Sequence, residues 1–490
     1  MNNPSPLVSL RFRPDEIAIP SNEPFKNDKL DREPFVNAAT DLLKAIQEPF
    51  VIALNAPWGS GKSTTFKLLE SKLQTENIIS IGFNAWEVDY STDPLVPLVA
   101  TMHERLLEIK GYGQSITPEK IERFKNLGGA IVKHGAIAAM KVATAGLFDG
   151  AAFADEIAKT AEKASEDLTG DVIDAFKREK DASQKFRELL KQITDYVRVQ
   201  TEDGKTPPPV VLLIDELDRC RPTFAVAMLE RIKHFFSVPG LVFVLALDIE
   251  QLKASTRKVY SIDMDAAEYL RRFIDLELRL PRSDIARMAD GMLTNCGADE
   301  YFLSRREYSE LREDRNWIVK VIKSLSKNFE LSPRTVQRMI SRLMLVLRQT
   351  PSNHYLDPIL VVFMIFLRMR DEDALRGLVY GRISARAVME SVANINPRGK
   401  EFCDSHIGRL IEGHLIFAQK SGPGREHTEE FIKMFNEISP ADMTSESMKV
   451  RDIHSYYSRV NSTYFSRGGI DLISIDARIN LISSDFSDKD

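Results

Sequence analysis

The chain has 490 residues, of which 43% are hydrophobic and 28% are charged. That length predicts more than one domain, and that composition excludes a largely disordered chain. The 66 basic and 71 acidic residues give a formal net charge of -5, which excludes binding to nucleic acid through an overall basic excess. The cysteines Cys220, Cys296 and Cys403 lie too far apart for a CxxC metal site or a disulfide framework. Because no secretory signal is visible at the amino terminus, we expect a reducing, cytoplasmic setting.

Between residues 34 and 247, outside the interval 126–209, two kinds of sequence pattern alternate. Residues 1–27 contain five prolines and are predicted to form an extended arm. Helical periodicity then alternates with nearly continuous apolar runs, which are typical of strands in a parallel sheet covered on both faces. The predicted helices are 34–48, 63–73 and 225–236, and the predicted strands are 50–54, 78–83, 210–214 and 241–247. This order predicts an α/β fold.

Helical patterns without strands fill the interval 126–209 and the chain after residue 281. Part of the interval, residues 127–148, is long enough to span a membrane, but Lys133, His134 and Lys141 interrupt it, so we predict packing on protein instead. The apolar run 359–367 is too short to span and predicts a buried helix. The predicted divisions are an arm (1–27), two core halves (28–125 and 210–282) around a helical insertion (126–209), a helical lid (283–348) and a mostly α-helical C-terminal region (349–490).

A glycine-containing loop directly follows the first predicted strand. It reads Ala56, Pro57, Trp58, Gly59, Ser60, Gly61, Lys62, Ser63, Thr64. This fits the phosphate-binding pattern GxxxxGK[ST], with Ala56 replacing the first glycine. Gly59 and Gly61 permit a backbone that turns N–H groups toward phosphate, and the following helix adds its positive end. Lys62 is predicted to reach the β- and γ-phosphates, and Ser63 to ligate Mg2+. The alternative is a chance Gly-Lys-Ser turn.

Two acids end the third predicted strand. Asp215 and Glu216 follow the apolar run 210–214, which is the Walker B arrangement. We predict that Asp215 holds Mg2+ through water and that Glu216 polarises the water that attacks the γ-phosphate. The alternative for Glu216 is that its side chain caps the next turn.

Several stretches in this order resemble the KAP family of P-loop NTPases. They are 215–220 (Asp-Glu-Leu-Asp-Arg-Cys), 83–86 (Phe-Asn-Ala-Trp), 93–95, 242–248, 269–273 and 332–338. The resemblance covers about residues 28–345. It implies an additional-strand NTPase core with a parallel sheet, ATP as the nucleotide, and a helical insertion between the Walker motifs. In many relatives that insertion carries transmembrane helices.

Further site residues are predicted from position together with the resemblance. Asp248 ends a strand as a polar sensor or simply as a helix N-cap. Arg272, with Arg271, is either an arginine finger or a surface charge. Arg334 begins a helix that Ser332 caps, and it is either a phosphate sensor or part of a solvated basic face.

Asn84 and Trp86 lie just after the second predicted strand. We expect Trp86 to be buried in the core, because a large aromatic residue at a strand end usually buries its ring. Asn84 is expected to orient water or a neighbouring loop.

Three functions fit these patterns. The first is an ATPase whose cycle moves the helical regions, as implied for an anti-phage or mobile-element-exclusion complex by prokaryotic relatives. Animal relatives are instead membrane-associated signalling proteins. The second is a nucleotide-gated switch or scaffold with little turnover. The third is a nucleic-acid sensor or motor, because residues 305–348 carry 11 Lys/Arg against 5 Asp/Glu. The expected partners are ATP and either a homo-oligomer or an operon-encoded effector protein.

Overall fold

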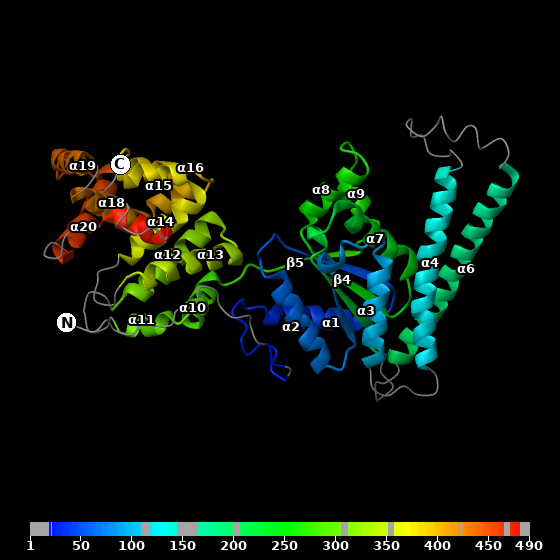
Figure 1. Ribbon diagram of the computed structural model, residues 1–490. Helices are drawn as coiled ribbons and strands as arrows, with labels where there is room; N and C mark the ends of the chain where they lie inside the picture. Colours follow the sequence, from blue (N-terminus) through cyan, green and yellow to red (C-terminus); the bar gives the residue numbers. More distant parts are fainter. Residues whose placement is uncertain are drawn as a thin grey trace, which may run out of the picture. The chain divides into compact units, whose positions relative to one another are not determined.

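A computed structural model describes residues 19–20, 22–108, 117–144, 165–198, 206–304, 312–350, 357–421, 424–464 and 471–480. The chain divides into two compact units between Arg282 and Ser283 (Figure 1). The first unit is Arg32–Arg282 with Ile17–Asp28, and the second is Ser283–Asp490 with Lys29–Asp31. Most of the predicted proline-rich arm lies outside the described residues.

A parallel sheet of five strands, in the order β2-β3-β4-β1-β5, forms the centre of the first unit. Its strands are β1 (Phe50–Asn55), β2 (Ser80–Asn84), β3 (Val210–Asp215), β4 (Leu241–Leu247) and β5 (Leu276–Arg279). Every residue of β4 is buried, as expected for a central strand covered on both faces. The α/β fold and the four predicted strands are confirmed. The sequence did not predict β5, whose residues alternate between half-buried and exposed.

Helices cover both faces of this sheet. On one face, α1 (Glu33–Ala45) and α2 (Lys62–Thr75) pack against one set of alternate strand residues, such as Ile52 and Val244. On the other face, α3 (Leu95–Glu108), the insertion and α7 (Pro222–Phe235) pack against the remaining set, such as Ala53 and Phe243. Short helices complete the unit: η1 (Trp86–Val88), η2 (Leu217–Arg219), α8 (Ile249–Val259) and α9 (Ala266–Leu270).

The described part of the insertion has two long helices that lie side by side, α4 (Pro118–Thr144) and α6 (Ser165–Arg198) (Figure 1). Their bases join the core through an aromatic chain, in which Phe186 stacks on Phe124 and meets Phe236 edge-on. The predicted helical insertion is confirmed, but the boundary at residue 126 falls inside α4. Within the described residues, no helix combines the length and apolarity that a membrane span requires.

The described part of the second unit is helical. Its elements are α10 (Ile285–Asn295), α11 (Ala298–Ser304), α12 (Asp314–Phe329), α13 (Pro333–Arg348), α14 (Pro358–Arg370), α15 (Glu372–Val379), α16 (Ala385–Asn394), α17 (Gly399–Asp404), α18 (His406–Ala418), η4 (Gln419–Ser421), α19 (Arg425–Glu437), α20 (Ser445–Tyr464) and α21 (Leu472–Asn480). Helix α14 is the predicted buried helix, and Pro358 to Leu367 are all buried.

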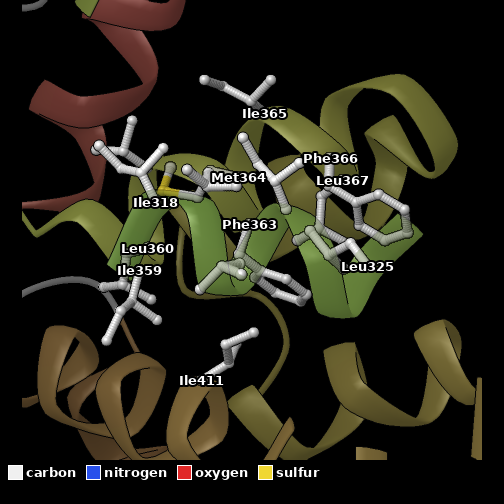
Figure 2. Close-up of a cluster of buried hydrophobic side chains, with 14 of the residues drawn as sticks. Ile318, Leu325, Ile359, Leu360, Phe363, Met364, Ile365, Phe366, Leu367 and Ile411 are labelled. Atoms are coloured by element: carbon white, nitrogen blue, oxygen red, sulfur yellow. The ribbon is translucent and has the colours of Figure 1, made fainter. Parts of the chain in front are cut away.

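One hydrophobic core joins the predicted lid to the predicted C-terminal region. Figure 2 shows α14 with Ile318 and Leu325 of α12 and with Ile411 of α18, all members of the same cluster. The separate lid and C-terminal region predicted from the sequence therefore pack as one unit, because α14 has no polar face that could remain in water.

Candidate functional site

The predicted loop connects β1 to α2 at the carboxyl edge of the sheet. The N–H of Ala56 donates to the carbonyl of Leu247 (3.1 Å), which ties the start of the loop to β4. Gly59 and Gly61 have φ values of 79° and 92°, a left-handed backbone that glycine adopts without the steric cost of a Cβ. The predicted strand–loop–helix arrangement is present, and it directs the amino end of α2 toward the loop.

A buried arginine supports this loop from outside it. Arg32, which is 1% exposed, donates from its guanidinium to the carbonyl of Ser60 (2.9 Å) and to the carbonyl of Pro281. The sequence did not single out Arg32, because its partners lie 28 and 249 residues away.

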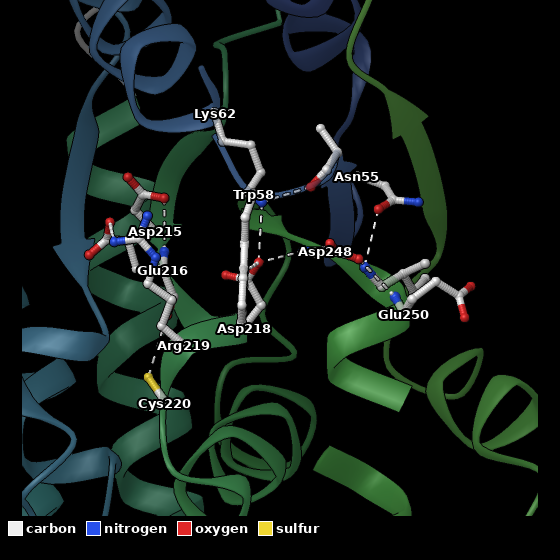
Figure 3. A network of polar contacts seen from close by, with 12 residues as sticks. Asn55, Trp58, Lys62, Asp215, Glu216, Asp218, Arg219, Cys220, Asp248 and Glu250 are labelled. Carbon is white, nitrogen blue, oxygen red and sulfur yellow. Dashed lines mark hydrogen bonds and ion pairs between the residues drawn. The ribbon is translucent and has the colours of Figure 1, made fainter. Parts of the chain in front are cut away.

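Lys62 lies folded back into the protein. It is 8% exposed, and its Nζ donates to the carbonyl of Ala56 (2.7 Å) and to Oδ2 of Asp218 (3.2 Å). The same Oδ2 accepts the indole N–H of Trp58 (2.8 Å) and the backbone N–H of Asp248 (2.8 Å) (Figure 3). Sequence reasoning gave Asp218 no role beyond membership of the 215–220 motif. Its position three residues after Asp215 was the available signal.

Ser63 and Asp215 meet across the loop. Burial raises the pKa of Asp215, and this effect is opposed by hydrogen bonds from the Ser63 hydroxyl and from the N–H of Glu216 and by the charge of Lys62. The Glu216 N–H lies 2.8 Å from Oδ1 of Asp215. A hydroxyl beside a carboxylate is a donor set that suits Mg2+, which prefers oxygen ligands. The two predicted metal-binding residues are therefore brought together, and they fit the ion.

Glu216 has a left-handed backbone with φ of 60°, which costs a non-glycine residue about 1–3 kcal/mol and is typical of functional sites. Its carboxylate forms an ion pair with Arg219 and accepts from Nδ2 of Asn84 (3.4 Å). Glu216 occupies the N-cap position of η2 without a capping side-chain bond, so the capping alternative is not observed. Asn84 therefore contacts the turn after β3, and its orienting role stays a prediction.

The prediction that Trp86 is a core residue is wrong. Its side chain is half exposed, and the guanidinium of Arg219 lies 5.6 Å from the centre of its ring. A cation over an aromatic face gains energy without burying the ring. Trp86 thereby joins Asn84 in surrounding the Arg219–Glu216 pair.

Asp248 is bonded to Asp218 of the site, whereas the predicted Arg271 and Arg272 contact other residues. The Asp248 carboxylate caps α8 by accepting the N–H of Glu250 (3.1 Å), while its own N–H binds Asp218. The exposed Arg272 lies over the ring of Tyr269, and the exposed Arg271 pairs with Glu268. Neither is bonded to the loop, and the arginine-finger role stays a prediction.

Arg334 belongs to the second unit, where it is exposed in the first turn of α13. The predicted cap is confirmed, because Ser332 Oγ accepts the N–H of Thr335 (3.2 Å). Its sensor role stays a prediction. One arginine of the predicted basic stretch 305–348 forms ion pairs inside the second unit: Arg315 pairs with Asp290 and with Asp299 (both 2.5 Å).

A solved ORC2 protein of Aeropyrum pernix, in ADPNP-ADP complexes, is 10% identical over 91% of this chain and 97% of its own, with a TM-score of 0.30. The Cdc6p structure from Pyrobaculum aerophilum is 9% identical over 95% of this chain and 96% of its own, with a TM-score of 0.33. At these TM-scores nothing about function follows from either likeness. No curated protein matches the chain.

The family comparison bears directly on the site. The model of the KAP family P-loop domain matches residues 32–350, which is more than half of the chain. That range contains the loop with Lys62, the acids that end β3 and the insertion between them. The chain therefore belongs to the KAP family of P-loop NTPases.

Proposed function

We propose that this protein is a Mg2+-dependent ATPase that uses its cycle to move its helical regions relative to the sheet. The observation that carries the proposal is the convergence of Lys62 and Ser63, at the start of α2, with Asp215 and Asp218, at the end of β3. Membership of a P-loop family supports nucleotide binding at this convergence.

In this proposal each group has a distinct task. The loop N–H groups and the amino end of α2 bind phosphate oxygens, and Lys62 neutralises the β- and γ-phosphates. Ser63, together with Asp215 through water, would hold Mg2+, and the ion would supply positive charge beside the phosphates. Glu216 orients and polarises the attacking water, while Asn84 and Arg219 fix the position of its carboxylate.

Steady-state ATP turnover of matched variants tests the proposal. We expect Lys62→Ala to lose both binding and turnover, and Glu216→Gln to keep binding but lose about 100-fold or more in kcat. Glu108→Gln, which changes an exposed carboxylate on α3, serves as the control and should turn over like wild type. Equal, near-zero rates for wild type and Glu216→Gln would defeat the ATPase proposal.

One observation favours the second function, a nucleotide-gated switch with slow turnover. Both chemical groups of the site are paired with protein partners, Lys62 with Asp218 and Glu216 with Arg219. The Lys62–Asp218 pair must rearrange before Lys62 can reach a phosphate, so binding and turnover can be separated. A wild type that binds ATP tightly and retains it unhydrolysed would favour the switch over the ATPase.

We also propose, from family membership, a cytoplasmic role in excluding phage or mobile elements together with an operon-encoded effector or as a homo-oligomer. Plaque counts on cells that express wild type or Lys62→Ala test this role. Protection that survives Lys62→Ala would separate it from the nucleotide site, and absence of protection by wild type would refute it.

A further inference from the structure

The carboxylate of Asp218 is the hub of the polar network in Figure 3. Its side chain is 1% exposed, and a single oxygen, Oδ2, accepts from Lys62, from Trp58 and from the backbone of Asp248. The other oxygen, Oδ1, is buried and has no hydrogen-bond partner in the described part of the chain. Three donors on one oxygen and none on the other indicate a carboxylate positioned by Lys62 and its neighbours.

These contacts join three connections of the sheet. Trp58 lies in the β1–α2 loop and Lys62 begins α2, Asp218 lies in η2 after β3, and Asp248 lies between β4 and α8. One side chain therefore links the Lys62 ammonium to the indole of Trp58 and to the start of α8.

The charges in this network are balanced while Lys62 contacts Asp218. A buried ammonium is costly without a counter-charge, and Asp218 supplies one at 3.2 Å. A nucleotide phosphate would be a second anionic acceptor for the same ammonium. Two anions near one buried cation repel each other, so binding of the phosphate weakens the Lys62–Asp218 pair.

We infer that Asp218 is a positioning residue that competes with nucleotide phosphate for Lys62, and that this competition couples nucleotide binding to Trp58 and to the β4–α8 turn. The inference rests on the proposed function, because it assumes that nucleotide binds at the loop. It adds a built-in opponent of nucleotide affinity, which neither the Walker motifs nor the family match assigns.

A substitution that removes the charge of Asp218 but keeps the shape of its side chain tests the competition. Asp218→Asn keeps an oxygen that can accept from Trp58 and Asp248 but removes the anion, so we expect AMP-PNP to bind about tenfold more tightly in isothermal titration calorimetry with Mg2+. The matched control is Glu250→Gln, which removes one carboxylate from the adjoining turn, where it is exposed and forms an ion pair with Lys253. The control should bind within about twofold of wild type.

The outcomes separate this inference from the proposed function. Tighter binding by Asp218→Asn alone supports the competition. Equal or weaker binding by Asp218→Asn, with a wild type that binds, overturns the competition and leaves the proposed function intact. An equal gain in Glu250→Gln overturns it as well, because the effect would then be a general response to charge. No binding by any of the three proteins refutes the proposed function and this inference with it.

A second measurement, of Trp58 fluorescence, keeps Asp218 in place and so does not depend on whether Asp218→Asn folds. The chain has three tryptophans, so a variant with Trp86→Phe and Trp317→Phe keeps Trp58 as its single tryptophan, whose emission is excited selectively. We expect AMP-PNP to shift the emission of Trp58 as its carboxylate partner is released from Lys62. Calorimetric binding without any change in this emission would overturn the coupling to Trp58.

Discussion

A buried carboxylate in the second unit predicts an unusual pH dependence of stability. Glu412 lies in the middle of α18, is 5% exposed and lines a cavity of about 200 Å³ with Met389, Cys403 and Phe431. In the described part of the chain no group donates a hydrogen bond to it. Burial raises its pKa from 4.5 to about 7, although Lys449 and Arg386 oppose the shift.

The raised pKa of Glu412 makes the folded protein less stable as pH rises. A carboxyl group with a raised folded-state pKa binds its proton more tightly in the folded protein, so its stabilising contribution is complete below pH 4.5 and is lost as pH rises through about 7. A rise of about 2.5 pKa units corresponds to about 3 kcal/mol, of which about 2 kcal/mol falls between about pH 5.5 and about pH 8.

Glu412→Gln removes this titration and keeps the volume of the side chain. We expect its free energy of unfolding to exceed that of wild type by an amount that grows by about 2 kcal/mol from about pH 5.5 to about pH 8. Urea unfolding in a Trp58→Phe, Trp86→Phe background measures the difference, because Trp317 is then the remaining tryptophan and lies in the second unit. A difference that does not vary with pH would refute the reasoning, since Glu412 would then be ionised in the folded protein at both values.

Three further changes test other parts of the structure. Ser332→Ala removes the cap of α13 and should lower the free energy of unfolding by about 1 kcal/mol; the same urea titration measures it, and no loss would show that the cap is dispensable. Gly61→Ala places a Cβ on a backbone with φ of 92°, so we expect the free energy of unfolding to fall by about 1–2 kcal/mol. AMP-PNP binding, measured by calorimetry, should also be lost. An unchanged free energy of unfolding and unchanged binding would contradict the role of the left-handed turn. Arg219→Gln frees Glu216 and should lower kcat about tenfold with little change in KM, whereas a change in KM alone in steady-state turnover would place Arg219 at the nucleotide instead.

The sequence predicted those features whose cause is local. The four apolar strands were visible because both faces of this sheet are covered, which removes polar residues from the runs. The loop was visible because a left-handed turn requires glycine and phosphate binding requires a lysine at a fixed spacing. Strand β5 escaped detection because it has four residues, none of them buried.

Other features depend on partners that are distant in the sequence. Trp86 was placed wrongly because its contact with Arg219 spans the whole insertion. The hub role of Asp218 arises only when the ends of β1, β3 and β4 meet at one edge of the sheet. The shared core of the predicted lid and C-terminal region likewise depends on how α14 packs between α12 and α18.

The state of bound nucleotide tests the central claim most directly. Wild type and Glu216→Gln are incubated with ATP and Mg2+, separated from free nucleotide and quenched, and the bound nucleotide is identified by chromatography. We expect ADP on wild type and intact ATP on Glu216→Gln. Intact ATP on both proteins, or no nucleotide on either, would contradict it.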